Sequence, residues 1–360
     1  MSRSNVSYDA PVYDLFPFHD VHLVLLSVLY GIAFIAGTPG NSLVILAVLL
    51  SKKLRTTTNT FVVNLSVADL LTCLVLIPVN ANVISTLYFG IGDLQVGLTL
   101  LLVTGFILYT TLGCSILTLI CIALNRWLLI TRPLTTYQKV YTPKKIAVCL
   151  MFVWVIPIVF VLTLGYSGLG KRYFIVVLAV AMFPIPLTVI IACYVLIWRR
   201  INRQVRSMAS SSHIPEVSNE PITHNSTETQ LDDIPTDSTQ PQARSNSAMT
   251  TGNDQLSRHQ IQITKNMFYV VCAFVLCVGP YAISLVPAIT DIKFVLVSQY
   301  ASAILVFNSC INPLIYATKH RDFKTVFRCI VSRQWDDIPE PSDFLKAVRR
   351  SKCCGRSNPV

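Results

Sequence analysis

Seven long apolar stretches constrain this chain of 360 residues more than any other feature. Each is about 20 residues or longer, the length that an α-helix needs to cross the hydrocarbon core of a bilayer. Of all residues, 53% are hydrophobic and only 13% are charged, whereas about a quarter of a soluble domain is charged. The sequence therefore predicts an all-α membrane protein, a bundle of seven transmembrane helices with a short amphipathic helix after the last span.

The predicted spans leave short joints and one long one. We expect an N-terminal segment at 1–21, a seven-helix domain at 22–318, an amphipathic helix at 319–331 and a tail at 332–360. The joint at about 203–258 is rich in Ser, Thr, Asn, Gln and Pro without an apolar period, so we expect it to be disordered. The spans themselves are expected at about 22–50, 59–86, 94–130, 144–165, 173–200, 259–288 and 294–317.

The distribution of the net charge of +11 predicts the orientation. Basic residues cluster after the first, third, fifth and seventh spans, while the opposite loops hold little beyond Lys171, Arg172 and Lys293. By the positive-inside rule the N-terminus lies outside the cell and the C-terminus in the cytoplasm, as in a multi-pass plasma-membrane protein. This pattern suits an acidic membrane surface, and nucleic acid is not an expected partner. The first apolar run lacks a preceding basic region with a cleavage site, so no cleaved signal peptide is expected.

The segment after the seventh span has the period of an amphipathic helix on the inner leaflet. Phe323, Val326, Phe327 and Ile330 fall at i, i+3, i+4 and i+7, with basic residues between them. All eleven cysteines lie in predicted spans or on the cytoplasmic side, so no extracellular disulfide is expected. Three cysteines near this surface are candidates for palmitoylation, although plain buried or tail cysteines fit equally: Cys329, Cys353 and Cys354.

Polar residues and prolines also lie inside the apolar stretches, where they are costly and often functional. Asp69 would sit near the bilayer centre, where a lone carboxylate is expensive. Oxygen and amide groups that could surround it belong to Asn41, Ser115, Asn308, Ser309 and Asn312. Prolines in the fifth, sixth and seventh spans loosen their helices, either for hinge-like switching or only structurally; they are Pro186, Pro280 and Pro313.

The order and spacing of these residues carry a family resemblance. Along the chain stand Gly40-Asn41, Asn64 to Asp69, Asn125-Arg126-Trp127 with Pro133-Leu134 after five residues, Trp154, Pro186 with Tyr194, Phe274 with Cys277 and Pro280, and Asn308-Ser309 with Asn312-Pro313 and Tyr316. Together they resemble the rhodopsin-like (class A) G protein-coupled receptors across all seven spans. The segment around Asn125, with Tyr137 and Tyr141, is most similar to the melatonin-receptor and Moody/Trapped-in-endoderm-like branch.

The resemblance implies a coupling site for a heterotrimeric G protein at the cytoplasmic end. Arg126 would meet the G protein when the sixth helix swings out, with Tyr194 and Tyr316 closing behind it; the other reading of Arg126 is an interfacial anchor. Leu134 would be an apolar contact, and Asn312-Pro313 would belong to the switch. The cluster of Asp69, Ser115, Asn308, Ser309 and Asn312 would hold an allosteric sodium ion, or would be a hydrogen-bonded network without an ion.

Three departures from the family pattern change what is expected. Asn125 and Gln260 replace the two carboxylates that usually pair with the arginine, so the salt bridge to Arg126 is missing and raised basal activity is our hypothesis. Val278 replaces the tryptophan two residues before the sixth-span proline, so the aromatic switch beneath the ligand is either absent or moved to Phe274 or Tyr281. Leu101 stands where the outer disulfide would begin, so a disulfide-held lid over the ligand is not expected.

The ligand is expected to be non-aminergic and lipophilic. Leu108 stands where amine receptors need a carboxylate, and Val306 stands where opsins need a lysine. Lys171 or Arg172 could pair with a carboxylate at the mouth of the pocket, which would suit a fatty-acid-like ligand. The candidate pocket residues, each of which could instead be ordinary packing, are Asn80, Tyr109, Arg172, Met182, Phe183, Tyr281, Ser284, Tyr300 and Ser302.

Other classes of function fit the sequence less well. A transporter would need paired ionisable residues across the membrane, and Asp69 has no titratable partner in the middle of another span. A membrane enzyme would need a catalytic set such as a histidine cluster, but the six histidines lie outside or at the edges of spans. A scaffold or decoy that binds ligand without coupling stays open because of Asn125 and Val278. Phosphorylation of the serines at 207 and 210–212 would recruit arrestin, although a plain solvated linker is equally consistent.

The orientation can be tested at two acceptor sites for N-glycosylation. Asn5 lies in the predicted outer segment, and Asn225 lies in the predicted inner loop. We expect Asn5→Gln to remove a glycan from the protein made in animal cells and Asn225→Gln to leave its gel mobility unchanged. The reverse result would mean that the N-terminus lies in the cytoplasm.

Overall fold

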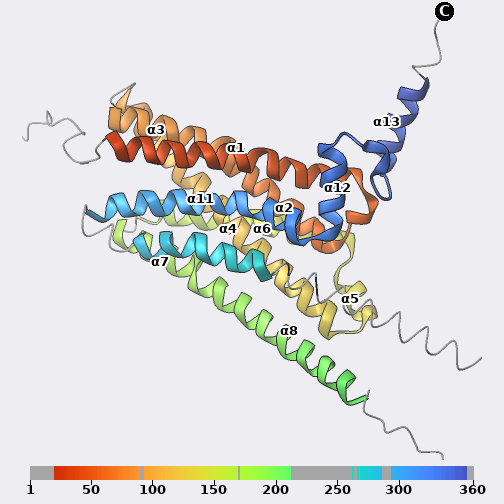
Figure 1. The fold of residues 1–360 in the computed structure, drawn as a ribbon. Coiled ribbons are helices and arrows are strands. Elements are labelled where there is room, and N and C mark those ends of the chain that lie inside the picture. Colours follow the sequence, from red (N-terminus) through yellow and green to blue (C-terminus); the bar gives the residue numbers. More distant parts are fainter. Residues whose placement is uncertain are drawn as a thin grey trace, which may run out of the picture.

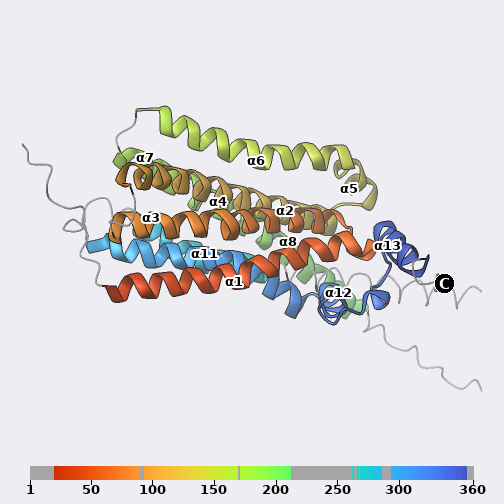
Figure 2. The ribbon, with the colours of Figure 1, turned by 90° about the horizontal axis from the view of Figure 1, so that it is seen from above.

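In the computed structural model, residues 20–89, 93–168, 171–211, 262, 266, 268–285 and 293–354 are described. Among these residues the regular structure is helical, and seven helices are long and apolar enough to cross a membrane. The predicted seven-helix bundle is thereby confirmed. The helices lie side by side, with α1 at one edge of the bundle and α6 at the opposite edge (Figure 2). We call the end of the bundle that carries α12 the inner end (Figure 1).

The first three spans are built from α1, the series α2–η3–α3, and α4. The turn η3 between α2 and α3 is π-helical, immediately before Pro78, and such turns occur where a proline interrupts the helical hydrogen-bond ladder. The hydroxyl of Thr56 caps α2 by accepting a hydrogen bond from the backbone of Asn59. The bounds are α1 Asp20–Leu50, α2 Thr57–Leu71, η3 Thr72–Leu76, α3 Ile77–Phe89 and α4 Leu94–Thr131.

The fourth to seventh spans include one broken helix. The fifth span is divided at Phe183 into α7 and α8, where Pro184 and Pro186 follow closely; proline cannot donate to the ladder. The sixth span is described over Phe268–Leu285. The other bounds are η2 Lys52–Leu54, α5 Leu134–Val140, α6 Pro143–Tyr166, α7 Lys171–Met182, α8 Pro184–Ser211, α11 Lys293–Lys319, α12 Arg321–Val331, η4 Trp335–Asp337 and α13 Asp343–Cys354.

The core lies between α1, α2, α4, α8 and α11, while α6 presents large apolar side chains outward. Met151 and Phe152 of α6 are 65% and 57% exposed, as expected for residues that face lipid. Helix α1 packs closely on α11 at Gly40, where an added Cβ would lie 3.0 Å from Cβ of Pro313. A glycine at this place therefore lets the two backbones approach, as small residues do between membrane helices.

The inner end differs from the prediction in three ways. Helix α8 continues to Ser211, so the long joint begins later than 203. The apolar residues Phe323, Val326, Phe327 and Ile330 of α12 are buried against the bundle, and do not face outward to a leaflet. The segment from 332, which was expected to be only a tail, forms the helices η4 and α13. Cys329 is also buried, at 6% exposed, whereas the side chains of the other two palmitoylation candidates, Cys353 and Cys354, lie outside the described part of the chain.

Candidate functional site

The centre of the bundle holds one buried carboxylate with two direct partners. Asp69 is 1% exposed on α2. Its Oδ1 accepts a hydrogen bond from Oγ of Ser309 at 2.9 Å, and its Oδ2 accepts one from Nδ2 of Asn312 at 2.8 Å. Both donors lie on α11. Because positions 309 and 312 are three residues apart, their side chains share one face of this helix. The predicted polar cluster is therefore assembled as a bridge between the second and seventh spans.

A small cavity of about 20 Å³ lies beside this carboxylate. It is lined by Asp69, Ser115, Asn308 and Ser309, together with Thr72 and Thr111. The side-chain oxygens of Asn308 and Asn312 are buried, and neither has a hydrogen-bond partner in the described part of the chain. Carboxylate, hydroxyl and amide oxygens are the ligands that hard cations prefer, and the space fits one ion or one water molecule. The residues present thus fit a sodium ion with Asp69 as the charged ligand.

Asn41 fastens α1 to the same region. Its Nδ2 donates to the backbone carbonyls of Gly37 and Ser309, at 2.9 and 2.7 Å. On the other side of the bundle, Nε1 of Trp154 donates to Oδ1 of Asn64 at 2.9 Å, and Asn64 donates to Thr118 at 2.8 Å. Polar side chains that the sequence placed in separate spans therefore join α1 to α11 and α2 to α4 and α6.

The inner end contains a cavity of about 250 Å³ around Arg126. Its lining includes Thr58 of α2, Tyr137 of α5 and His320 next to α12. Arg126 is only 4% exposed, so its guanidinium lies below the surface and not at a lipid headgroup. This placement does not match a surface anchor, the other reading of this residue.

Asn125 makes two hydrogen bonds with neutral groups beside Arg126. Its Oδ1 accepts from Oγ1 of Thr58 at 2.8 Å, and its Nδ2 donates to the hydroxyl of Tyr137 at 3.0 Å. These bonds join α4 to α2 and to the short helix α5. The carboxylate that the family usually has at this position is thus replaced by an amide whose two polar atoms are both paired.

The remaining coupling candidates lie around the same end. Tyr194 is buried on α8 with its ring 5.5 Å from that of Phe268, and Tyr316 is buried on α11 and stacked at 5.5 Å on Phe323 of α12. Among the residues that the structure describes, the buried hydroxyls of both tyrosines have no hydrogen-bond partner. Leu134 is 62% exposed at the start of α5, as a contact for a partner protein must be.

The candidate ligand residues of the outer half divide into two groups. In the first, the hydroxyls of Tyr109 and Tyr281 lie 3.2 Å apart, and with Phe183 and Val278 they line a cavity of only about 20 Å³. Val278 lies where the sequence departs from the family, and both aromatic residues that could replace the missing tryptophan, Phe274 and Tyr281, are buried. A ligand would have to separate these side chains, because ligand pockets are usually more than about 300 Å³.

The second group lies between α1, α3 and α11. The hydroxyl of Tyr300 is 2.9 Å from Nδ1 of His22, and the hydroxyl of Tyr30 donates to Ser302 at 3.4 Å. Asn80 is half-buried on α3. Ser284 belongs to neither group: it lies in the sixth helix, where it is buried and donates to the carbonyl of Tyr281. Asn5 and the side chains of Arg172 and Met182 lie outside the described part of the chain.

One contact at the inner end had no signal in the sequence analysis. Nδ2 of Asn266, at the inner end of the sixth helix, donates to the backbone carbonyl of Lys319 at 2.7 Å. The Lys319 ammonium in turn lies 5.6 Å from the ring of Tyr269, within the range of a cation–π interaction. These contacts tie the sixth helix to the end of α11. An asparagine facing a helix end has no motif of its own, so only the packing identifies it.

Comparison with known proteins gives the family. Residues 40–169 and 166–316 match the family described as 7 transmembrane receptor (rhodopsin family). The chain belongs to this family. It is 26% identical to the G-protein coupled receptor 84 of Bos taurus over 86% of this chain and 92% of that one, and 27% identical to octopamine receptor beta-1R of Drosophila melanogaster over 85% and 62%. Squid rhodopsin has the same fold, with a TM-score of 0.69, 18% identity and coverage of 100% and 98%.

Membership of this receptor family confirms several of the expectations from the sequence. The receptor is a multi-pass protein of the plasma membrane that acts in signal transduction, and it is not an enzyme. Heterotrimeric G proteins are the partners that the family implies. The residues quoted for the resemblance fall inside the matched ranges, from Gly40 to Tyr316.

We expect Asn266→Ala to loosen the inner end of the sixth helix. The change removes a hydrogen bond of about 1 kcal/mol and leaves the Lys319 carbonyl without this donor. Hydrogen exchange, measured by mass spectrometry on the purified receptor, should quicken by roughly fivefold for amides near residue 268, since 1.4 kcal/mol corresponds to a factor of ten. The control is Ser284→Ala at the outer end of the same span. Unchanged exchange in Asn266→Ala would show that this bond does not hold the helix.

Proposed function

We propose that this protein transmits the binding of an extracellular, non-aminergic and lipophilic ligand to heterotrimeric G proteins. The N-terminus lies outside and the C-terminus in the cytoplasm, as the distribution of basic residues favours. The proposal rests first on Arg126, buried in a cavity of about 250 Å³ at the inner end with Leu134 exposed on the adjoining helix α5. A cavity of this kind suits a partner element that inserts from the cytoplasm.

The character of the ligand is supported by the outer half of the bundle. Leu108 and Val306 line the cavity beside Asp69, at the positions where a carboxylate or a lysine would be needed for an amine or for retinal. The paired hydroxyls of Tyr109 and Tyr281 are uncharged, and their surroundings are Leu112, Leu178 and Leu285. A neutral ligand with one polar group would replace this hydroxyl pair at the least cost, since an unpaired buried polar group is expensive.

The hypothesis of raised basal activity is supported by Asn125, an amide at the position where the family usually has a carboxylate. A carboxylate well paired with the Arg126 guanidinium would favour the closed inner end by about 1–3 kcal/mol, whereas Asn125 forms hydrogen bonds to Thr58 and Tyr137. A smaller energy gap raises the population of the open state without ligand. The second candidate, a non-coupling scaffold or decoy receptor, shares the Asn125 and Val278 departures but leaves the buried Arg126 without a role.

Basal G protein activation in cells tests this proposal across the main G protein classes. We expect a signal from the wild type that Arg126→Ala abolishes and that Asn125→Asp lowers by roughly tenfold, for a gain of about 1.4 kcal/mol in the closed state. Leu124→Ala, a lipid-facing neighbour that is 37% exposed, is the control and should signal as the wild type does. A wild-type signal no higher than in mock-transfected cells, with the receptor at the surface, would contradict raised basal activity; Arg126→Ala that still couples would contradict the coupling site.

The same proposal includes allosteric sodium at Asp69. Ser115, Asn308, Ser309 and Asn312 would complete the site by geometry and chemistry. A sodium ion would neutralise the buried carboxylate and bridge α2 and α11, so it would favour the arrangement in which these helices are joined. Without an ion, the same groups form a hydrogen-bonded network, which is the alternative reading.

Sodium binding is measured as thermal stabilisation of the purified receptor. At a sodium concentration ten times the Kd, binding should add about 1.4 kcal/mol to the free energy of unfolding, and the melting temperature should rise relative to choline chloride. We expect Asp69→Asn to lose this rise and Thr104→Val, whose hydroxyl bonds only within its own helix, to keep it. An equal rise in melting temperature for Asp69→Asn would show that sodium does not bind at Asp69.

A further inference from the structure

The tail of this receptor is fastened to the loop after the first span by backbone and side-chain bonds. The amide of Lys52 donates to the carbonyl of Glu340 at 2.7 Å, and the amide of Ser342 donates to the carbonyl of Leu50 at 2.8 Å. The hydroxyl of Ser51 donates to the carbonyl of Pro339 at 2.7 Å. These bonds form an isolated antiparallel bridge between residues almost 290 positions apart in the sequence. We call this contact the tail clasp.

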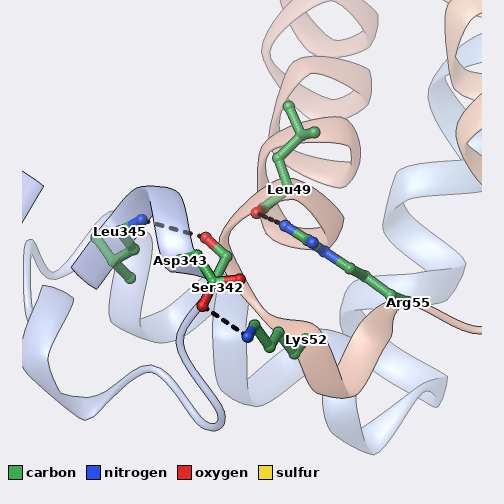
Figure 3. Close-up of polar contacts among 6 residues, drawn as sticks. All are labelled: Leu49, Lys52, Arg55, Ser342, Asp343 and Leu345. Carbon is green, nitrogen blue, oxygen red and sulfur yellow. Dashed lines mark hydrogen bonds and ion pairs between the residues drawn. The ribbon is translucent and has the colours of Figure 1, made fainter. Parts of the chain in front are cut away.

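Charged and capping side chains continue the tail clasp into α13, as Figure 3 shows. Nζ of Lys52 lies 2.7 Å from Oδ1 of Asp343, and this partner lowers the pKa of the Asp343 carboxyl. The hydroxyl of Ser342, which is fully buried, accepts from the amide of Leu345 at 3.2 Å and so caps the helix. Arg55 closes the end of α1 by donating to the carbonyl of Leu49 at 2.8 Å.

Apolar burial holds the same junction. Leu54 is 1% exposed, Ile338 3% and Leu345 5%, and all three belong to the main core together with the apolar face of α12. Further along α13, Arg349 pairs with Asp336 and donates to the carbonyl of Trp335. Helix α13 is therefore a fixed extension of the bundle, and its direction is set by contacts on both sides of Ser342.

Helix α13 is basic in sequence and exposes two apolar side chains. It carries Lys346, Arg349, Arg350 and Lys352 against one acidic residue, Asp343, which Lys52 already pairs. Of the basic side chains that the structure describes, Lys346 and Arg350 are exposed. Phe344 is 67% exposed and Val348 is 36% exposed, one helical turn apart on the same side. Short helices that combine basic residues with exposed aromatic side chains bind at the boundary of an anionic bilayer.

The position of α13 suits the same partner. It begins beside Leu50 and Lys52, where the first span leaves the membrane. Figure 1 shows that α13 runs across the direction of α1 and extends past the bundle on the side away from α8. In a bilayer around the seven spans, a helix with this direction would lie along the headgroups of the inner leaflet.

We propose that α13 is a membrane-surface helix of this receptor that binds the anionic inner leaflet, held there by the tail clasp. The role expected for the apolar face of α12 passes to α13, because the face of α12 is covered by the bundle and by Ile338 and Leu345. Basic residues near an anionic leaflet are attracted within about a Debye length of roughly 8–10 Å. Phe344 would enter the headgroup region, and Lys346 and Arg350 would contact phosphate or carboxylate groups.

The test uses the full-length receptor in nanodiscs, with Cys353→Ser and Cys354→Ser in every sample so that no acyl chain contributes. Hydrogen exchange of the amides at 343–354 is compared between discs of phosphatidylcholine alone and discs that also contain phosphatidylserine. We expect exchange to be roughly tenfold slower with phosphatidylserine, and the difference to shrink at high salt.

Two charge variants separate this proposal from a general effect of lipid. Lys346→Gln/Arg350→Gln should lose most of the difference between the two lipids, while the matched variant Lys139→Gln/Lys144→Gln should keep it. Neither residue of the first pair takes part in the tail clasp, and Arg349 is left intact because of its pairing with Asp336. Phe344→Ser should quicken exchange in discs with phosphatidylserine without affecting the amides of α12.

Three results would overturn the proposal. Equal protection of 343–354 in both lipids would mean that α13 contacts only protein or neutral bilayer. A lipid difference that survives in Lys346→Gln/Arg350→Gln would mean that other charges cause it. Unprotected exchange in both lipids would mean that the tail clasp does not hold α13 at the membrane.

Discussion

The absence of water from the bilayer core is the constraint on which this structure depends. An unpaired polar group costs several kcal/mol in hydrocarbon, so a buried polar side chain of a span is stabilised by a partner on its own or a neighbouring helix. Hydroxyl groups can pair within their own helix: those of Thr72, Thr104 and Thr118 donate to the backbone carbonyl four residues earlier. Asn41, Asn64 and Asp69 pair across helices, and these cross-links determine which spans become neighbours.

The same constraint explains why neutral groups at the inner end are not equivalent to the charges that they replace. A carboxylate next to Arg126 would have to be paired or protonated, whereas the amide of Asn125 is satisfied by one hydroxyl donor and one hydroxyl acceptor. The sixth helix is likewise held by an amide and a carbonyl, between Asn266 and Lys319. Hydrogen bonds of this kind exchange partners at lower cost than buried ion pairs, so the described contact between Asn266 and Lys319 can part without breaking a salt bridge.

The spans and the central site could be predicted because their signals are local and strong. Apolar runs of span length fix the helices, and a carboxylate in such a run predicts polar neighbours, which is how Ser309 and Asn312 were found. The contact of Asn266 could not be predicted, because one asparagine near a helix end has no pattern. The tail clasp could not be predicted either, since its bonds are between backbone groups at residues 50–52 and 340–342. The spacing of apolar residues in α12 predicts an amphipathic helix correctly, but it does not tell whether the apolar face meets lipid or protein.

The burial of the α12 face links the coupling region to the tail. Tyr316 stacks on Phe323 at 5.5 Å, and Phe323 lies 5.6 Å from Phe327 in an edge-to-face pair. The same core contains Ile338 and Leu345 of the tail and Leu54 after the first span. Because packed cores resist continuous deformation, a change in the position of the Tyr316 ring cannot be absorbed at Phe323 alone. Movement of the seventh span is therefore passed to α12 and, through the apolar contacts beside the tail clasp, to the base of α13.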